Sequence, residues 1–147
     1  MLLLSNTNNV PELNLAAEEF FITDDRLFQD AVMLWRNKPS VIVGRYQNTV
    51  EEINYRYTKK RNIPVVRRLS GGGAVYHDLG NVNFTFFTYA RENENLSMAR
   101  FLNPIVTTLG KLGVDARISG RNDLTVDGRK ISGNAQYLFG DRFMHHG

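Results

Sequence analysis

The sequence has no cysteine among its 147 residues and no long hydrophobic run. The lack of cysteine excludes a disulfide-stapled secreted fold and a cysteine nucleophile within this segment. No apolar stretch approaches the roughly 18 residues of a membrane-spanning helix. The opening "MLLLSNTNN" lacks the basic region and the apolar length of a signal peptide. We therefore expect a cytoplasmic protein that does not enter a membrane.

Several common site motifs are also missing. The three consecutive glycines at residues 71–73 are not followed by Gly-Lys-Ser or Gly-Lys-Thr, so they do not form a P-loop. They could begin the dinucleotide-binding pattern G-x-G-x-x-G, but Tyr76 occupies its last position. The sequence has no Gly-x-Ser-x-Gly nucleophile elbow and no metal-ligand spacing. A net charge of +3 suits an anionic ligand but is too small to indicate nucleic acid.

The composition is that of one compact globular domain, with 42% hydrophobic and 22% charged residues. Apolar residues at helical spacing and helix-end signals predict helices over residues 14–22, 49–62 and 97–113. Runs of β-branched and aromatic residues predict strands over residues 31–36, 40–48, 64–68, 74–76 and 81–89, followed by hairpins over residues 123–132 and 135–146.

Local signals refine the predicted helices. Asn14 is a candidate cap for the first helix, because its side chain can accept a hydrogen bond from the first turn. Pro104 lies inside the third predicted helix, which must either kink there or begin later, with Asn103 as its cap. Gly113 is expected to end this helix.

The two predicted hairpins have their own turn signals, Asp127-Gly128 and Gly140-Asp141. His145 and His146 should point to opposite faces of their strand, and we expect one in the core and the other on a polar surface. The apolar residues of the last hairpin would need further chain to cover them in a closed domain. These residues are Tyr137, Leu138, Phe139, Phe143 and Met144.

The stretch "VVRRLSGGGAVYHDLGN", residues 65–81, places bare backbone beside two arginines. Glycines between two strands let a ligand approach closely and can aim amide hydrogens at anionic oxygens. Arg68 could add a two-pronged cation for phosphate or carboxylate. The alternative is a tight turn with solvated arginines. The ligand-binding interpretation gains because His77, Asp78 and Asn81 follow within the same short span.

A second polar cluster is "SGRNDLTVDGRKISGNAQ", residues 119–136. Asn122 and Asp123 could hold a hydrated magnesium ion or orient phosphate, although such a pair is also ordinary turn chemistry. Lys130 follows the predicted hairpin turn, where a lone lysine is usually solvated. A functional role for it is favoured by a second bare backbone position at Gly133, followed by Asn134.

Together, "RRLSGGGAVYHDLGN", "GRNDLTVDGRKISGNA" and the final "HHG" closely resemble the catalytic domain of the lipoate–protein ligase A family. The resemblance runs from "NLAAEEFF" through "GRYQN" to the last residue. It implies an α+β fold with a mixed, largely antiparallel sheet flanked by helices, shared with biotin protein ligases and class II aminoacyl-tRNA synthetases. It also implies two reactions. Lipoate and Mg-ATP give lipoyl-adenylate, and the lipoyl group then passes to a lysine on a lipoyl domain of a 2-oxoacid dehydrogenase or on the glycine-cleavage H protein.

The resemblance also implies roles for individual residues. Lys130 would be the essential lysine that touches the carboxyl and phosphate groups of the intermediate, and Arg68 would contact phosphate and adenylate. Asp123 would lie near phosphate and the Mg²⁺ ion. The whole implied site for ATP and lipoyl-adenylate comprises Arg68, Ser70, Gly71, Gly72, Gly73, Ala74, Val75, Tyr76, His77, Asn81, Asn122, Asp123, Lys130 and Gly133.

Other interpretations remain open. An octanoyl- or lipoyl-transferase of the same superfamily would use a cysteine thioester, which could lie only in sequence beyond this segment. Biotin ligation fits less well, because the glycine motif there usually reads Gly-Arg-Gly-Arg. A non-catalytic fragment that binds a lipoyl ligand is the third alternative. Members of the resembled family have longer catalytic domains, so we expect residues 1–147 to be the N-terminal portion of one.

Overall fold

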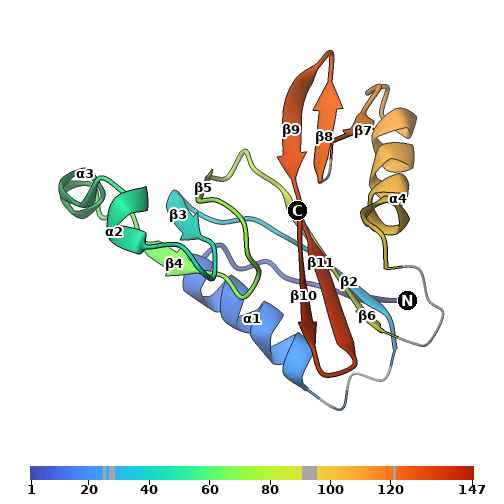
Figure 1. Ribbon diagram of the computed structural model, residues 1–147, viewed down its shortest axis with the longest axis horizontal. Helices are drawn as coiled ribbons and strands as arrows, with labels where there is room; N and C mark the ends of the chain where they lie inside the picture. The colour runs from blue at the N-terminus through green and yellow to red at the C-terminus, as the bar shows by residue number, and fades with distance from the viewer. Residues whose placement is uncertain (25, 27–28, 91–95, 121) are drawn as a thin grey trace.

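The computed structural model describes residues 1–24, 26, 29–90, 96–120 and 122–147. In this part of the chain the strands form one five-stranded and two three-stranded sheets, with helices packed beside them (Figure 1). The predicted α+β class, with mixed and largely antiparallel sheets, is confirmed. No helix among the described residues is long and apolar enough to cross a membrane.

The five-stranded sheet has the strand order β1-β2-β6-β11-β10. Strands β1 and β2 run parallel, and every other neighbouring pair is antiparallel. The sheet brings the N-terminal strand and the C-terminal hairpin together around β6, which lies at its centre. Its strands are β1 (Leu2–Leu4), β2 (Ala31–Trp35), β6 (Asn83–Tyr89), β10 (Ala135–Phe139) and β11 (Arg142–His146).

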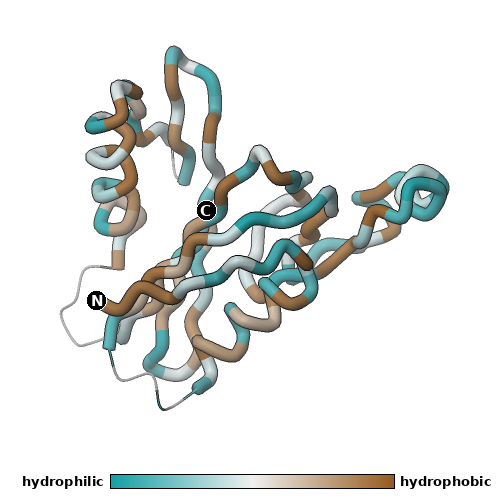
Figure 2. Tube along the Cα trace, turned by 180° about the vertical axis from the view of Figure 1, so that it is seen from behind, coloured by the Kyte–Doolittle hydropathy of each residue, from teal (hydrophilic) through white to brown (hydrophobic). Residues whose placement is uncertain are grey.

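Helix α1 (Pro11–Thr23) covers one face of this sheet. Because side chains alternate along a strand, every second residue of β2, β6 and β11 faces this helix. Each large side chain buried there contributes roughly 1.5–3 kcal/mol. The core on this face consists of Leu15, Ile22, Ala31, Met33, Trp35, Ile42, Phe87 and Met144. Figure 2 shows hydrophobic segments among the strands at the centre of the molecule.

The prediction that Asn14 caps α1 is wrong. The cap position is Val10, and Pro11 occupies the first turn, where its missing N–H costs nothing. Asn14 is instead buried within the helix, and its amide donates to the carbonyl oxygens of Asn8 and Arg36 and to Asn37 Oδ1. The side chain that the sequence suggested as a helix cap therefore ties α1 to two loops.

Helix α4 (Met98–Lys111) packs against part of the opposite face. It begins after Ser97 and continues through Pro104, so the later start at Asn103 is wrong. Gly113, at φ +83°, follows its end as predicted. The core on this face consists of Phe84, Leu102 and Leu124, with Phe86, Met98, Ile105 and Val106 packed against them.

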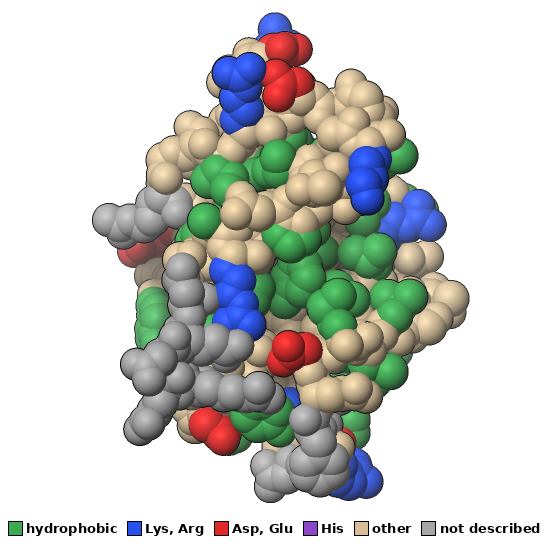
Figure 3. Space-filling model, turned by 90° about the vertical axis from the view of Figure 1, so that its right-hand side faces the viewer, with side chains coloured by type: hydrophobic (Ala, Val, Ile, Leu, Met, Phe, Trp, Pro, Cys, Tyr) green, Lys and Arg blue, Asp and Glu red, His purple; other side chains and the backbone are tan. Residues whose placement is uncertain are grey.

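The rest of this sheet face is apolar and open. Val32 and Leu34 of β2 alternate with the core residues, and Leu3 lies beside Val32 in register. Leu3 is 67% exposed and Leu34 is 51% exposed. Figure 3 shows hydrophobic side chains gathered on this side of the molecule.

The second sheet has the order β4-β3-β5 and carries the glycine-rich stretch between two of its strands. Strand β3 (Ser40–Val43) runs parallel to β4 (Val65–Arg67) and antiparallel to β5 (Val75–His77). Helices α2 (Thr49–Glu52) and α3 (Tyr55–Lys60) project away from the sheet.

The single helix predicted over residues 49–62 is wrong, because the chain breaks between α2 and α3. Asn54 accepts a hydrogen bond from the Tyr57 amide at 3.0 Å and so caps a new helix. Asparagine favours such caps over helix interiors, which explains the break.

The third sheet has the order β7-β8-β9 and stands beside α4. Its strands are β7 (Arg117–Ser119), β8 (Asp123–Val126) and β9 (Arg129–Gly133). The predicted hairpin turn is confirmed, with Asp127 at φ +49° and Gly128 at φ +72°. Strand β7 was not predicted as a strand of its own.

The β10–β11 hairpin is also confirmed. We expected its apolar side chains to need further chain to cover them, and the described residues already bury some of these side chains. Phe143 and Met144 on β11 are buried within the described structure. Leu138 and Phe139 on the edge strand β10 are 55% and 46% exposed. Only part of the predicted apolar surface is therefore left open.

Candidate functional site

The glycine loop, defined here as residues 70–74, connects β4 to β5 and is held from inside by Arg68. The guanidinium is buried, with 9% exposure. Its Nη2 donates to the carbonyl oxygens of Gly71 and Gly73, both at 2.8 Å. Its Nη1 donates to Ile42 O at 3.3 Å, and its Nε donates to Ser70 Oγ at 3.2 Å. Burial lowers the pKa of Arg68, and the negative charge of Glu18 partly offsets this.

These contacts decide where the loop amides point. In a trans peptide the N–H lies opposite the C=O of the same unit, and the described chain has no cis peptide bond. Since the carbonyls of Gly71 and Gly73 point at Arg68, the N–H groups of Gly72 and Ala74 point away from it. The loop thus presents amide hydrogens on its outer side, an arrangement that suits an anion.

Two glycines are required by this geometry. Gly72 has φ +95°, a conformation that other residues rarely adopt. Gly44, at the end of β3, packs so closely on the loop that a Cβ there would overlap the carbonyl oxygen of Gly72. Gly73, by contrast, has open space where a Cβ would be. Close packing of two loops therefore requires the glycine at position 44.

Arg67 holds the neighbouring loop in the same manner as Arg68 holds the glycine loop. Its Nη1 donates to Gly44 O at 2.8 Å and to Gln47 O at 2.9 Å, and its Nη2 donates to Thr49 Oγ1 at 2.6 Å. Arg67 ends β4 and Arg68 follows it directly, so successive side chains of the chain point to different sides. The paired arginines each secure one loop, a role the sequence did not reveal.

Arg45 is an exposed cation that follows Gly44 directly in the chain. Its guanidinium lies over the rings of Tyr46 and Tyr137, at 5.6 and 5.1 Å from their centroids. A hydrogen bond with Tyr137 raises the pKa of Arg45. The ring of Tyr46 also borders Gly71, at 3.8 Å from the position of a Cβ. Arg45 and Tyr46 belong to the segment "GRYQN", for which the sequence predicted no role.

The second cluster centres on an ion pair between Lys130 Nζ and Asp123 Oδ1 at 2.8 Å. The side chain of Lys130 is 57% exposed and that of Asp123 is 31% exposed, although the paired oxygen Oδ1 is itself buried. Gly133 lies against this pair, and a Cβ there would approach Lys130 Nζ to 3.1 Å. The bare backbone noted in the sequence therefore makes room for the lysine.

Asn122 and Asn134 close the base of the third sheet. Asn122 Nδ2 donates to Asn134 O at 2.7 Å, and Asn134 Nδ2 donates to Asn122 O at 2.8 Å. The side-chain Nδ2 groups of both asparagines therefore donate to protein backbone. Arg121, within the same motif, lies outside the described residues.

The end of β11 joins the two clusters. His146 Nε2 lies 2.6 Å from Ser70 Oγ of the glycine loop. The next residue, Gly147, packs so tightly on Asn134 and Phe84 that a Cβ would overlap them. Ser70 of the first motif and Asn134 of the second, about sixty residues apart in sequence, therefore both lie against the end of β11.

The remaining predicted residues lie along β5 and the turn after it. His77 Nδ1 lies 3.1 Å from Asn37 Nδ2, and burial, with the nearby Arg68 charge, lowers the pKa of His77 to about 4. Asn81 Nδ2 donates to Asn83 Oδ1 at 2.9 Å. Val75 and Tyr76 are exposed, at 43% and 56%. The structure thus turns His77 inward and Tyr76 outward.

The prediction that one of the two adjacent histidines is surface-exposed is wrong. His145 and His146 do face opposite sides of β11, but both are buried. His145 stacks on Phe101 with ring centroids 4.7 Å apart, and burial lowers its pKa to about 4. Covering both faces of the sheet with helices leaves neither histidine in water.

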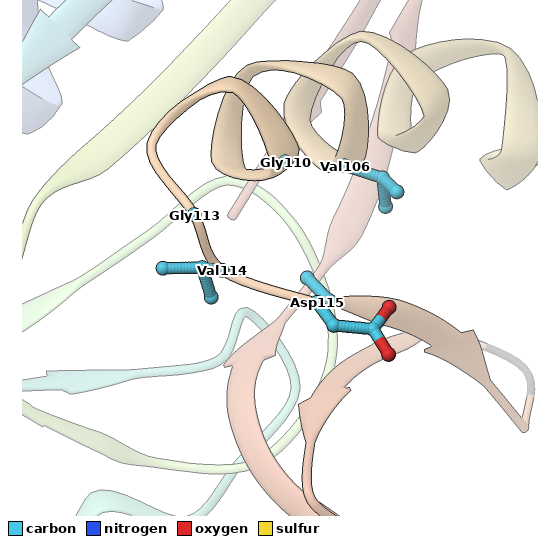
Figure 4. Close-up of a pocket in the computed structure, with 6 residues that line it drawn as sticks. Val106, Gly110, Gly113, Val114 and Asp115 are labelled. Carbon is cyan, nitrogen blue, oxygen red and sulfur yellow. The ribbon is translucent and has the colours of Figure 1, made fainter.

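No group of three or more His, Cys, Asp or Glu side chains that could hold a metal occurs among the described residues. A surface hollow of about 360 Å³ lies elsewhere, at the end of α4 (Figure 4). It is lined by Val106, Gly110, Gly113, Val114, Asp115 and Ala116. None of these is a predicted site residue, so the candidate site rests on the two clusters instead.

The catalytic domain of lipoyl protein ligases A and B matches residues 10–147 of this chain. The chain belongs to this family. LplJ, a lipoate-protein ligase of Bacillus subtilis, is 49% identical over 148 residues, covering 100% of this chain and 45% of the ligase. This chain of the lipoyl protein ligase family therefore spans less than half the length of that curated relative.

Two solved structures share the fold of this family member. The bipartite lipoate protein ligase of Thermoplasma acidophilum, described with its E2 lipoyl domain, has a TM-score of 0.86 and 36% identity, covering 99% of this chain and 58% of its own. A lipoate-protein ligase A bound with ATP has a TM-score of 0.87 and 31% identity, covering 99% and 64%.

Proposed function

We propose that this chain forms the adenylate-forming part of a lipoate–protein ligase. The proposal is carried by two features: a fixed glycine loop with outward amides, which contacts the end of β11 through His146, and an accessible lysine on β9, the strand that leads into Asn134 beside Gly147. In the first reaction a lipoate carboxylate oxygen attacks the α-phosphorus of ATP, and the bond to pyrophosphate breaks. In the second, a lysine amine attacks the acyl carbon, and the bond to AMP breaks.

The two clusters suit different parts of this chemistry. Negative charge gathers on phosphate oxygens, and hydrogen-bond donors fixed beforehand stabilise such charge effectively. We assign that task to the outward N–H groups of Gly72 and Ala74, with Arg68 holding the loop from inside. Lys130 is a compact cation that can leave Asp123 and follow an oxygen as it changes partners.

A direct contact between Arg68 and phosphate, which the resemblance implies, would require the guanidinium to give up its bonds to Gly71 and Gly73. We therefore infer that Arg68 acts chiefly through the loop. Val75, Tyr76, His77 and Asn81, along β5 and the turn after it, are candidates for contact with the nucleotide.

Asp123 and Asn122 fit the oxygen donors that Mg²⁺ prefers. Magnesium usually keeps several waters and uses one or two carboxylates together with substrate phosphates, so a single accessible carboxylate at Asp123 is adequate. When bound, the ion would neutralise phosphate charge. Asp123 would hold it after releasing Lys130, and the bond from Asn122 Nδ2 to Asn134 O leaves the side-chain oxygen of Asn122 as a second donor.

The acceptor that we propose is a lysine on a lipoyl domain, of a 2-oxoacid dehydrogenase or of the glycine-cleavage H protein. The Thermoplasma acidophilum relative, described with its E2 lipoyl domain, supports this class of acceptor. We expect the reaction in the cytoplasm. No covalent enzyme intermediate is needed, which agrees with the absence of cysteine from these residues.

The test is lipoate-dependent release of pyrophosphate from ATP by the intact protein. We expect Lys130→Ala to lower this rate by roughly a hundredfold or more, while Arg129→Ala, which removes the neighbouring exposed cation, retains it. Equal rates for the two variants would contradict the assignment of Lys130. Lipoate binding without any pyrophosphate release would favour the non-catalytic alternative.

A further inference from the structure

A buried chain of hydrogen bonds connects the core of the molecule to the glycine loop. Trp35 Nε1 donates to Thr85 Oγ1 at 2.9 Å, and Thr85 Oγ1 donates to Glu18 Oε1 at 2.6 Å. The same carboxylate oxygen lies 2.9 Å from His146 Nδ1, and His146 Nε2 lies 2.6 Å from Ser70 Oγ. This series of hydrogen bonds therefore begins under α1 and ends at Ser70, the first residue of the glycine loop.

The direction of each bond follows from its donors. A carboxylate only accepts, so His146 Nδ1 carries a hydrogen and donates to Glu18. In the neutral ring Nε2 is then an acceptor, and Ser70 donates its hydroxyl hydrogen to it. The lone pairs of Ser70 Oγ remain available to accept from Arg68 Nε, at 3.2 Å. Every bond from Trp35 to Arg68 thus has one donor and one acceptor.

The same series of hydrogen bonds connects two opposite charges inside the protein. Glu18 is 1% exposed and Arg68 is 9% exposed. A buried carboxylate or guanidinium is costly unless it has an opposite charge or hydrogen bonds. His146 and Ser70 connect the two, and Glu18 is the charge that favours the ionised form of Arg68.

We propose that Glu18 and His146 are positioning residues that fix the glycine loop for its ligand through Ser70 and Arg68. The inference rests on the function proposed above, in which the outward loop amides bind phosphate. Removing His146 should release Ser70, and the carbonyls of Gly71 and Gly73 would then be held by a less constrained Arg68. Neither Glu18 nor His146 needs to touch the phosphates for this effect.

The adjacent histidine provides a matched control. His145 and His146 have the same residue type, lie on the same strand and are both buried, but only His146 contacts the loop. We would compare His146→Phe with His145→Phe in the intact protein, since both keep an aromatic ring. Lipoate-dependent pyrophosphate release should fall by roughly ten- to a hundredfold in kcat/KM for ATP with His146→Phe, and only slightly with His145→Phe.

Conservative variants separate positioning from packing. The amide of His146→Gln approximates Nε2 and can still reach Ser70, whereas that of His146→Asn approximates Nδ1 and can reach only Glu18. If the link to Ser70 fixes the loop, the Gln variant should retain more activity than the Asn variant. Equal activity of the two would overturn the proposal, because loss of packing alone does not distinguish the two ends of the ring.

A second readout does not depend on the proposed activity. The Arg45 amide donates to Ser70 O at 2.9 Å, so its hydrogen exchange reports on the loop directly. We expect exchange roughly tenfold faster in His146→Phe and in Ser70→Ala than in His145→Phe. Unchanged exchange would overturn the positioning role even if the wild type were active. Faster exchange in a protein without ligase activity would support the role and contradict the proposed function.

Discussion

The glycine loop and the Lys130–Asp123 pair both present charge or hydrogen bonds to a ligand, but they are built in opposite ways. The loop is held by a buried arginine whose donors are directed at protein carbonyls. Lys130 is 57% exposed, and its partner in the structure is a single carboxylate that is itself partly exposed. One region is fixed from the core, and the other can rearrange at little cost.

This difference matches two needs of acyl-adenylate formation. Donors that are fixed before the ligand arrives need no reorganisation during the reaction. A cation that follows a shifting charge must be able to move, and an exposed ion pair worth about 0–1 kcal/mol can be exchanged easily. If the two regions differ in this way, substitutions that release the glycine loop should cost more stability than substitutions at the ion pair.

Arg68→Ala should produce the largest loss. It leaves the carbonyls of Gly71 and Gly73 without their donor and removes the charge that balances Glu18, so we expect a loss of roughly 3–5 kcal/mol in the free energy of unfolding. Arg67→Ala, whose bonds are mostly to an exposed loop, should cost clearly less. Chemical denaturation measures both, and equal losses would remove the distinction between a buried and an exposed arginine.

Burial of His77 should also make the stability of the protein sensitive to acid. The folded protein holds the pKa of His77 at about 4, against an ordinary value of 6.5. Between those values the unfolded chain takes up a proton that the folded chain does not, so stability is full above pH 6.5 and falls as the pH drops toward 4. We expect His77 to lower the free energy of unfolding by roughly 2–3 kcal/mol over this pH range.

His77→Gln should remove about half of this pH dependence, because glutamine cannot take up the proton whereas His145, whose pKa burial also lowers to about 4, still does. Unfolding measured at pH 7 and at pH 4.5 for the wild type and the variant gives the comparison. If the difference between the two pH values were the same in both proteins, His77 would not be the group responsible.

Two glycines near the loop should behave differently. Gly44→Ala places a Cβ against the carbonyl oxygen of Gly72 and should cost about 1–3 kcal/mol by overpacking. Gly73→Ala meets nothing within 4 Å and should change stability by less than about 0.5 kcal/mol. Thermal unfolding of the two variants checks this, and an intolerant Gly73 would show that the loop packs more closely than described.

Lys130→Ala should have the smallest effect on stability, within about 1 kcal/mol of the wild type, although we expect it to abolish pyrophosphate release. Lys130→Arg should also be a poor enzyme, because a planar guanidinium does not replace a compact ammonium. A loss of several kcal/mol in Lys130→Ala would mean that the lysine supports the fold.

Features that depend on neighbouring residues could be predicted from the sequence. The Asp127-Gly128 turn, the positive φ of Gly72 and the end of α4 near Gly113 each follow from a local conformational requirement. That the two polar clusters form one site is also a prediction, and it comes from the order and spacing of the motifs.

Features that depend on distant partners could not be predicted. Asn14 looks like a helix cap in sequence, yet its partners lie in two loops, one of them more than twenty residues away. The inward direction of Arg68 depends on carbonyls beyond the end of its strand, and the role of Glu18 depends on His146 at the other end of the chain. No local pattern distinguishes such residues from a solvated charge.

The most direct test of the central claim is a crystal structure of the intact protein with a non-hydrolysable lipoyl-adenylate analogue. We predict that Arg68 Nη2 still donates to the carbonyls of Gly71 and Gly73, that the amides of Gly72 and Ala74 face the phosphate, and that Lys130 has moved from Asp123 to the ligand. The account would be contradicted if Arg68 had left the loop to bind phosphate while Lys130 stayed paired with Asp123.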